Sequence, residues 1–217
     1  MSNQNPHQGQ SVATAGVLLA NAEEAMVIMH GRGGTNHQAL ALSDYLNVPG
    51  FAFLAPQAAN HSWYPHRFIA PRKSNEPYLS SALNALHDVI KHIEAQGIPT
   101  SKIMLLGFSQ GACLCGEYAA RHPKRYGGVM ILSGGLIGTD DELTGYKGSL
   151  DNTPIFLGCS DVDEHIPEKR VHQSAEILKK LDGNVETRIY PGMGHTINNE
   201  ELNVVKSIME QVVATEL

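Results

Sequence analysis

A glycine–serine–glycine pattern near the middle of the chain constrains its fold more than any other feature. The apolar run Ile103–Leu106 leads into Gly107-Phe108-Ser109-Gln110-Gly111, and a segment of small residues with helical spacing follows at once. This order predicts a strand, a sharp turn and a helix, with one serine hydroxyl raised above the end of a parallel sheet. Glycine suits both flanking positions, because side chains there would collide where the strand and the helix meet. Ser109 is therefore the candidate nucleophile.

Short apolar runs alternate with longer amphipathic segments along the rest of the chain. Strands are expected over 12–20, 24–29, 51–55, 102–107, 128–132, 155–159 and 185–190. Helices are expected over 35–46, 79–96, 110–122, 167–181 and 199–213. Such alternation predicts right-handed βαβ units, and therefore an α/β fold with a mostly parallel central sheet and helices on both faces.

Length and composition favour one domain. A chain of 217 residues, of which 42% are hydrophobic, can bury one sizeable core. Residues 1–10 are polar, so a flexible N-terminal lead-in is expected there, with a single domain over residues 11–217. The segment 133–152 is rich in Gly and Asp and is expected to form a loop, which either acts as a partial lid or lies inert on the surface.

Charge and cysteine usage exclude several classes of partner. The formal net charge is −6, so no basic surface for nucleic acid is expected. No apolar run reaches the ~18 residues of a membrane helix, so membrane insertion is not expected either. The 3 cysteines indicate free thiols in a reducing, cytoplasmic location. The 11 histidines show no metal-ligand spacing, so neither a metal nor another cofactor is expected. A homodimer is compatible with the sequence.

A histidine and a group of carboxylates lie at the ends of two later strands. His195 follows the last expected strand in a glycine-rich loop, and it is the candidate base, because a serine hydroxyl needs a partner that takes its proton. The acid that orients the imidazole is expected after the preceding strand, where Asp161, Asp163 and Glu164 lie. Asp163 is preferred and Asp161 is the alternative, since distance from the strand end does not separate them.

A glycine-rich turn after an early strand supplies a candidate oxyanion hole. Acyl transfer to a serine places negative charge on a carbonyl oxygen, which two backbone N–H groups usually bind. Gln110 provides one of them, and Arg32 in the segment His30–Gly34 is the candidate for the other. A phosphate-binding loop is the rival interpretation, but the segment has neither the GxGxxG spacing nor the Lys-Ser/Thr pair of such loops. His30 is expected to be buried, with its ring supporting this turn.

Together these motifs resemble the phospholipase/carboxylesterase branch of α/β hydrolases, which includes acyl-protein thioesterases and bacterial carboxylesterases. The matching segments are His30–Gly33, Ala55–Gln57, Gly107–Gly111, Asp163–Pro167 and Gly194-His195. The resemblance implies an α/β-hydrolase fold with a minimal cap domain or none, Asp163 as the acid, and Arg32 as an oxyanion donor. Glu164 stands where the family has a proline.

The resemblance also implies a reaction. A serine hydrolase is expected, which cleaves small-molecule carboxylic esters of small to medium acyl chains through an acyl-enzyme, with Ser109, His195 and Asp163 as its triad. An acyl-thioesterase or lysophospholipase with the same triad is the first alternative. A catalytically silent binding protein of the same fold is the second.

The substrate pocket is expected to draw on an aromatic stretch of the chain. Trp63, Tyr64 and Phe68 either form its wall, since ligand sites are mostly apolar, or hold a long loop on the domain. This stretch is similar to bacterial carboxylesterases of the hydroquinone-responsive and dienelactone-hydrolase-like type. Arg32 and His165 are expected near the cleft, where they would favour substrates that carry a carboxylate.

Overall fold

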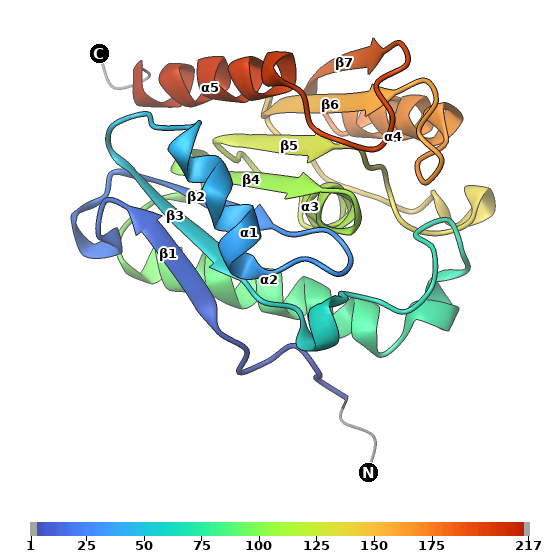
Figure 1. The fold of residues 1–217 in the computed structure, drawn as a ribbon, viewed down its shortest axis with the longest axis horizontal. Helices are drawn as coiled ribbons and strands as arrows, with labels where there is room; N and C mark the ends of the chain where they lie inside the picture. Colours follow the sequence, from blue (N-terminus) through green and yellow to red (C-terminus); the bar gives the residue numbers. More distant parts are fainter. Residues whose placement is uncertain (1–3, 215–217) are drawn as a thin grey trace.

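The computed structural model describes residues 4–214, which form one central sheet flanked by helices (Figure 1). The strands are β1 (Val12–Gly16), β2 (Glu24–Met29), β3 (Phe51–Pro56), β4 (Ile103–Phe108), β5 (Gly128–Leu132), β6 (Pro154–Ser160) and β7 (Asn184–Tyr190). The helices are α1 (Asn36–Leu40), α2 (Tyr78–Ala95), α3 (Gln110–Arg121), α4 (Glu168–Lys180) and α5 (Asn199–Ala214). Two elements are shorter than the sequence predicts. The first strand ends at Gly16, which has a φ of 74°, and α1 gives way to a 3-10 turn after Leu40.

The sheet has the strand order β1-β3-β2-β4-β5-β6-β7, and every neighbouring pair is parallel except β1 with β3. β1 and β2 are consecutive in the sequence, but β3 lies between them in the sheet. Exposure alternates along β1, as expected for an edge strand with one solvated face, whereas β2 to β5 are almost entirely buried. Burial on both faces is typical of parallel strands covered by two helical layers.

Helices cover both faces of the sheet, as the sequence predicts (Figure 1). Alternate strand residues point to opposite layers. Val27 and Leu105 belong to the core beneath α2, α3 and α4, while Met26 and Leu106 belong to the core beneath α1 and α5. The mostly parallel sheet with two helical layers is therefore confirmed.

The N-terminal segment differs from its prediction. A flexible lead-in is expected over residues 1–10, but His7 is only 2% exposed. Its backbone N–H donates to Ser81 Oγ at 3.0 Å, its Nε2 lies 2.8 Å from the Trp63 carbonyl oxygen, and its Nδ1 accepts from the Ala59 N–H at 3.1 Å. These contacts fix the segment against α2 and against residues 57–77, which we call the aromatic loop. A polar stretch of sequence does not predict such tertiary contacts. Residues 1–3 lie outside the described part.

The two longest connections, residues 57–77 and 133–153, carry only 3-10 turns. Within residues 4–214 no cap domain is inserted above the sheet. The described helices include none with both the length and the apolar character needed to cross a membrane.

The topology collects four loops at one edge of the sheet. Ser109 follows β4, Asp163 follows β6 and His195 follows β7, while Arg32 follows β2. Because these strands are parallel, their carboxyl ends meet at the same edge, where ligands bind in open α/β sheets.

Candidate active site

Ser109 sits on a strained turn between β4 and α3. Its φ of 55° and ψ of −119° lie outside the regions that side-chain-bearing residues favour, at a cost of order 1–3 kcal/mol. A Cβ on Gly107 would lie 2.3 Å from the Gly111 carbonyl carbon, and a Cβ on Gly111 would lie 2.2 Å from the Met29 carbonyl oxygen. The two glycines are therefore required for steric reasons, as the sequence predicts. The close packing that they allow lets the turn present the Ser109 side chain at its surface.

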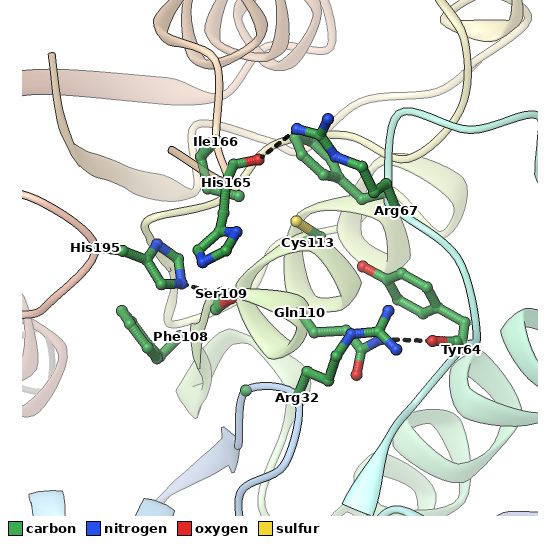
Figure 2. Close-up of a pocket in the computed structure, with 12 residues that line it drawn as sticks. Arg32, Tyr64, Arg67, Phe108, Ser109, Gln110, Cys113, His165, Ile166 and His195 are labelled. Carbon is green, nitrogen blue, oxygen red and sulfur yellow. Dashed lines mark hydrogen bonds between the residues drawn. The ribbon is translucent and has the colours of Figure 1, made fainter. Parts of the chain in front are cut away.

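Ser109 begins a chain of two hydrogen bonds. Its Oγ lies 2.8 Å from His195 Nε2 (Figure 2), and His195 Nδ1 lies 2.7 Å from Asp163 Oδ2. Because a carboxylate only accepts hydrogen bonds, Nδ1 carries the ring proton, and Nε2 is free to accept the serine proton. The structure thus brings together the three residues that the sequence predicts from three separate strand ends.

Two rings hold the His195 imidazole in place. The Phe108 ring centroid lies 4.9 Å from that of His195, and the His165 ring meets it edge-on at 4.7 Å. Such packing restricts rotation of the imidazole, so its two ring nitrogens are held in position for the hydrogen bonds to Ser109 and Asp163.

Asp163 is the acid in contact with the imidazole. Its side chain is fully buried, and its Oδ1 accepts from the backbone N–H groups of His165 at 2.8 Å and Ile166 at 3.0 Å. Burial alone raises the pKa of this carboxyl, but the hydrogen bonds from His195 and from the two N–H groups outweigh burial and hold the pKa below its usual value. Asp163 is therefore a carboxylate at neutral pH.

Asp161, the alternative acid, has another task. Its Oδ1 accepts from the Gly192 N–H at 2.8 Å, and the neighbouring Ser160 Oγ accepts from the Gly194 N–H at 3.0 Å. Both contacts anchor the loop that carries His195. The geometry therefore separates the two aspartates that distance from the strand end leaves equivalent.

His30 supports the glycine-rich turn at residues 31–34, as the sequence predicts. It is 3% exposed, its Nδ1 lies 2.7 Å from the Gly31 carbonyl oxygen, and its Nε2 accepts from the Ala58 N–H at 3.0 Å. This pairing requires a neutral ring with its proton on Nδ1. Burial lowers the pKa of His30, which keeps that neutral form at physiological pH.

The Gln110 side chain ties the aromatic loop to the serine turn. Its Oε1 accepts from the Trp63 N–H at 2.8 Å, and its Nε2 donates to the Tyr64 carbonyl oxygen at 2.7 Å. Buried amides of this kind need both partners, because an unpaired one costs about 1–3 kcal/mol.

A cavity of about 300 Å³ opens above Ser109 (Figure 2). Tyr64, Phe68 and His165 line it, as the sequence predicts. Trp63 does not, so the prediction that it forms part of the wall is wrong. Its ring is completely buried behind the turn, where Nε1 donates to the His30 carbonyl oxygen at 2.9 Å. Trp63 holds the loop on the domain, which is the other role considered for it.

Five further residues, which the sequence does not assign to the site, also line the cavity: Gly31, Arg67, Phe108, Cys113 and Ile166. Phe108 is identifiable from the motif, since it precedes the serine at the strand end. Arg67 has no such signal, because it lies in an irregular loop. No lining residue comes from segment 133–152, so nothing here supports a lid role for that loop.

A second, smaller cavity of about 250 Å³ lies beside the first. It shares Gly31, Arg32 and Phe108 with the first cavity, and its other lining residues include the apolar Leu42 and Ile197. The two cavities flank the glycine-rich turn. Within residues 4–214, no group of three or more His, Cys, Asp or Glu side chains could hold a metal ion.

Glu201 fixes the far end of the His195 loop. It is fully buried, its Oε2 accepts from the Asn198 N–H at 2.9 Å, and its own N–H donates to Asn198 Oδ1 at 2.9 Å. This reciprocal pair caps the start of α5. Burial raises the pKa of Glu201 to about 7, because no described cation pairs with the charge.

Glu201→Gln is expected to stabilise the protein in a pH-dependent way. The folded state holds the Glu201 proton more tightly than the unfolded state, so stability falls as the pH rises from about 4 to about 7. Glutamine keeps a capping acceptor without the charge, so Tm should rise by about 3 °C or more at about pH 8 and change little near pH 4. Thermal unfolding at both pH values measures this, with Glu210→Gln, an exposed position in the same helix, as control. An equal shift at both pH values would contradict it.

A parallel sheet between two helical layers, with Ser109, His195 and Asp163 joined at its carboxyl edge, defines an α/β hydrolase. Residues 19–213 match the family model described as Phospholipase/Carboxylesterase, and the chain belongs to this family. The resemblance and the fold class inferred from the sequence are both confirmed.

Individual relatives agree with this assignment. The crystal structure of a phospholipase/carboxylesterase from Dyadobacter fermentans is 41% identical, covers 93% of this chain and 97% of its own, and superposes with a TM-score of 0.89. Acyl-protein thioesterase 1 of Saccharomyces cerevisiae is 30% identical over 89% of this chain and 95% of its own length. Carboxylesterase SOBER1 of Arabidopsis thaliana is 27% identical over 69% of this chain and 67% of its own.

Proposed function

We propose that this protein is a serine hydrolase that cleaves carboxylic esters through an acyl-enzyme intermediate. The observation that carries the proposal is the continuous hydrogen-bonded chain from Ser109 through His195 to the buried carboxylate of Asp163. Membership of the phospholipase/carboxylesterase family supports the same chemistry. A silent binding protein would have no use for nucleophile, base and acid in one connected array.

In the first step, Ser109 Oγ attacks the ester carbonyl carbon while its proton passes to His195 Nε2. The carbonyl π pair moves to oxygen, and when the tetrahedral intermediate collapses the C–O bond to the alcohol breaks. His195 gives its proton to the departing alcohol, which leaves the acyl group on Ser109. Water then attacks this acyl ester and loses a proton to His195. When the second tetrahedral intermediate collapses, the bond from the acyl carbon to Ser109 Oγ breaks, His195 returns the proton to Oγ, and the acid is released. Asp163 stays ionised and stabilises the imidazolium that forms in each step.

The backbone N–H groups of Arg32 and Gln110 are the proposed donors to the oxyanion. Both residues line the cavity next to Ser109, and a Cβ on the adjacent Gly31 would lie only 3.3 Å from Ser109 Cβ. Donors held by a rigid turn act without reorganisation, and removal of one typically costs ~10²–10³ in rate. The contacts of His30 provide that rigidity.

The size of the cavities favours small to medium acyl chains. The first cavity, of about 300 Å³, is at the lower end of the range for ligand sites. An acyl-thioesterase is the second candidate, because the same triad serves both reactions and because one relative is an acyl-protein thioesterase.

The three buried, unpaired thiols support a reducing, cytoplasmic location. A homodimer stays a prediction.

Two measurements test the proposal. A fluorophosphonate probe should label Ser109 stoichiometrically, as detected by intact and peptide mass. Hydrolysis of p-nitrophenyl esters from acetate to decanoate, beside matched thioesters, should show a preference for short oxygen esters. Faster cleavage of long-chain thioesters would favour the second candidate, and absence of both labelling and turnover would leave the binding protein.

Asp163→Asn is expected to lower kcat by about 10⁴. An amide at this place donates as well as accepts, so it favours the imidazole tautomer that cannot take the serine proton. Asp161→Asn is the matched control, since asparagine keeps an acceptor for the Gly192 N–H, and its activity should change little. Steady-state kinetics on the best p-nitrophenyl ester compares them. The reverse order of the two losses would make Asp161 the acid.

A further inference from the structure

The catalytic cavity is positively charged in a protein that is negative overall. The chain has 22 acidic and 16 basic residues, with Lys and Arg counted as basic. Yet the cavity lining includes two arginines, Arg32 and Arg67, and no aspartate or glutamate. The two acids close in sequence to this lining, Asp163 and Glu164, do not form part of it. The carboxylate of Asp163 is buried and bonded to His195, and the side chain of Glu164 is 82% exposed.

Arg32 places one guanidinium on the aromatic loop. Its Nη1 donates to Ser62 Oγ at 3.0 Å and to the Pro65 carbonyl oxygen at 3.1 Å, and its Nη2 donates to the His66 carbonyl oxygen at 2.9 Å. All three partners are neutral. The group is therefore held in one position while its full positive charge stays uncompensated.

Arg67 brings a second guanidinium from the same loop. The residue is exposed, and its one hydrogen bond to the described part of the chain is a 3.3 Å contact from Nη2 to the His165 carbonyl oxygen. Within residues 4–214 neither arginine forms an ion pair. In Figure 2 both guanidinium groups lie across the cavity from His195, on the side of Tyr64. Most donors of Arg67 are thus available to a molecule bound over Ser109.

We propose that the substrate is an ester that also carries a carboxylate, and that Arg67, with the charge of Arg32 beside it, binds this carboxylate while Ser109 attacks the ester. The inference rests on the proposed function and names its substrate class. A planar guanidinium matches a carboxylate with two parallel N–H···O bonds, which a neutral ester of equal size cannot form. The apolar second cavity then receives the uncharged half of the molecule.

Matched ester pairs test the proposal. Mono-p-nitrophenyl adipate and p-nitrophenyl hexanoate have acyl chains of equal length, and only the first carries a carboxylate. Para-acetoxybenzoate and its methyl ester place the charge on the alcohol side instead. The rate measured with Ser109→Ala is subtracted as background. In at least one pair, kcat/KM of the wild type should then be about tenfold or more higher for the anionic ester than for the neutral one. This preference should be smaller at high salt, because ions screen the charges.

Variants of Arg67 test whether this residue causes the preference for the anionic ester. Arg67→Gln should remove most of it by lowering kcat/KM for the anionic ester alone, and Arg67→Lys should restore part of it. Arg125→Gln is the matched control, because Arg125, like Arg67, donates only to backbone carbonyls in the described structure, but lies before β5, at the opposite edge of the sheet. Its preference should equal that of the wild type.

The outcomes separate the inference from the proposed function. Hydrolysis that depends on Ser109 but is equal for charged and neutral esters overturns the carboxylate proposal and leaves the esterase intact. A preference that survives in Arg67→Gln also overturns the assignment. If no ester is hydrolysed and the probe leaves Ser109 unlabelled, the proposed function fails and the inference fails with it.

Discussion

Ser109→Ala is expected to lower kcat for ester hydrolysis by about 10⁶. The substitution removes the atom that forms the acyl-enzyme, and His195 alone can activate only a water molecule that nothing in the turn positions. The remaining contacts of the site, including the bond from His195 to Asp163, do not involve the hydroxyl. The loss should therefore appear in kcat, with substrate binding nearly unchanged.

The fold should tolerate Ser109→Ala. Alanine keeps the Cβ, and in the described structure the hydrogen bond of the Ser109 hydroxyl is to His195 Nε2. Thermal unfolding of the variant should match that of the wild type, and the fluorophosphonate probe should no longer label it. Residual activity above about one hundredth of the wild-type value would mean that another nucleophile carries the reaction.

Gly111→Ala is expected to destabilise the fold strongly, although it adds a single methyl group. Its Cβ would lie 2.2 Å from the Met29 carbonyl oxygen and 2.7 Å from that of His30. Both are backbone atoms, at the end of β2 and at the start of the glycine-rich turn, so no side-chain rotation relieves the overlap. Either α3 or the turn must move, which separates Ser109 from Arg32, the proposed oxyanion donor on that turn.

We expect a loss of about 3 kcal/mol or more in the free energy of unfolding, at the upper end of overpacking effects, and a Tm lower by roughly 10 °C. Urea and thermal unfolding measure both quantities. Gly116→Ala is the control in the same helix, because its Cβ would meet the flexible Ile131 Cδ1 at 2.9 Å rather than backbone. Equal stability of the two variants would show that the elbow is less closely packed than these distances imply.

The sequence determines the parts of the site that depend on neighbouring residues. Gly107, Ser109 and Gly111 encode the elbow within one turn of chain, because steric overlap at that place excludes any larger flanking residue. The order of strands and helices follows from hydrophobic periodicity in the same local way. His195 is found because the topology sends every such loop to the same edge.

Contacts between loops depend on sheet register and on packing, which no short segment contains. The choice of Asp163 over Asp161 follows from which carboxylate reaches the imidazole, a matter of a few ångströms. The sequence leaves Trp63 two roles, in the pocket wall or as an anchor of its loop, and its indole N–H is in fact bonded to the His30 carbonyl oxygen behind the turn. The His7 contacts likewise join segments far apart in sequence.

Arg67 depends both on local sequence and on tertiary packing. Its charge is visible in the sequence, but its place over Ser109 depends on how a loop of irregular backbone folds across the sheet edge. Local sterics and periodicity thus specify the elbow and the architecture from the sequence alone. Only the tertiary structure decides which polar side chains meet, because each such contact joins separate strand ends through distances that the whole packed core sets.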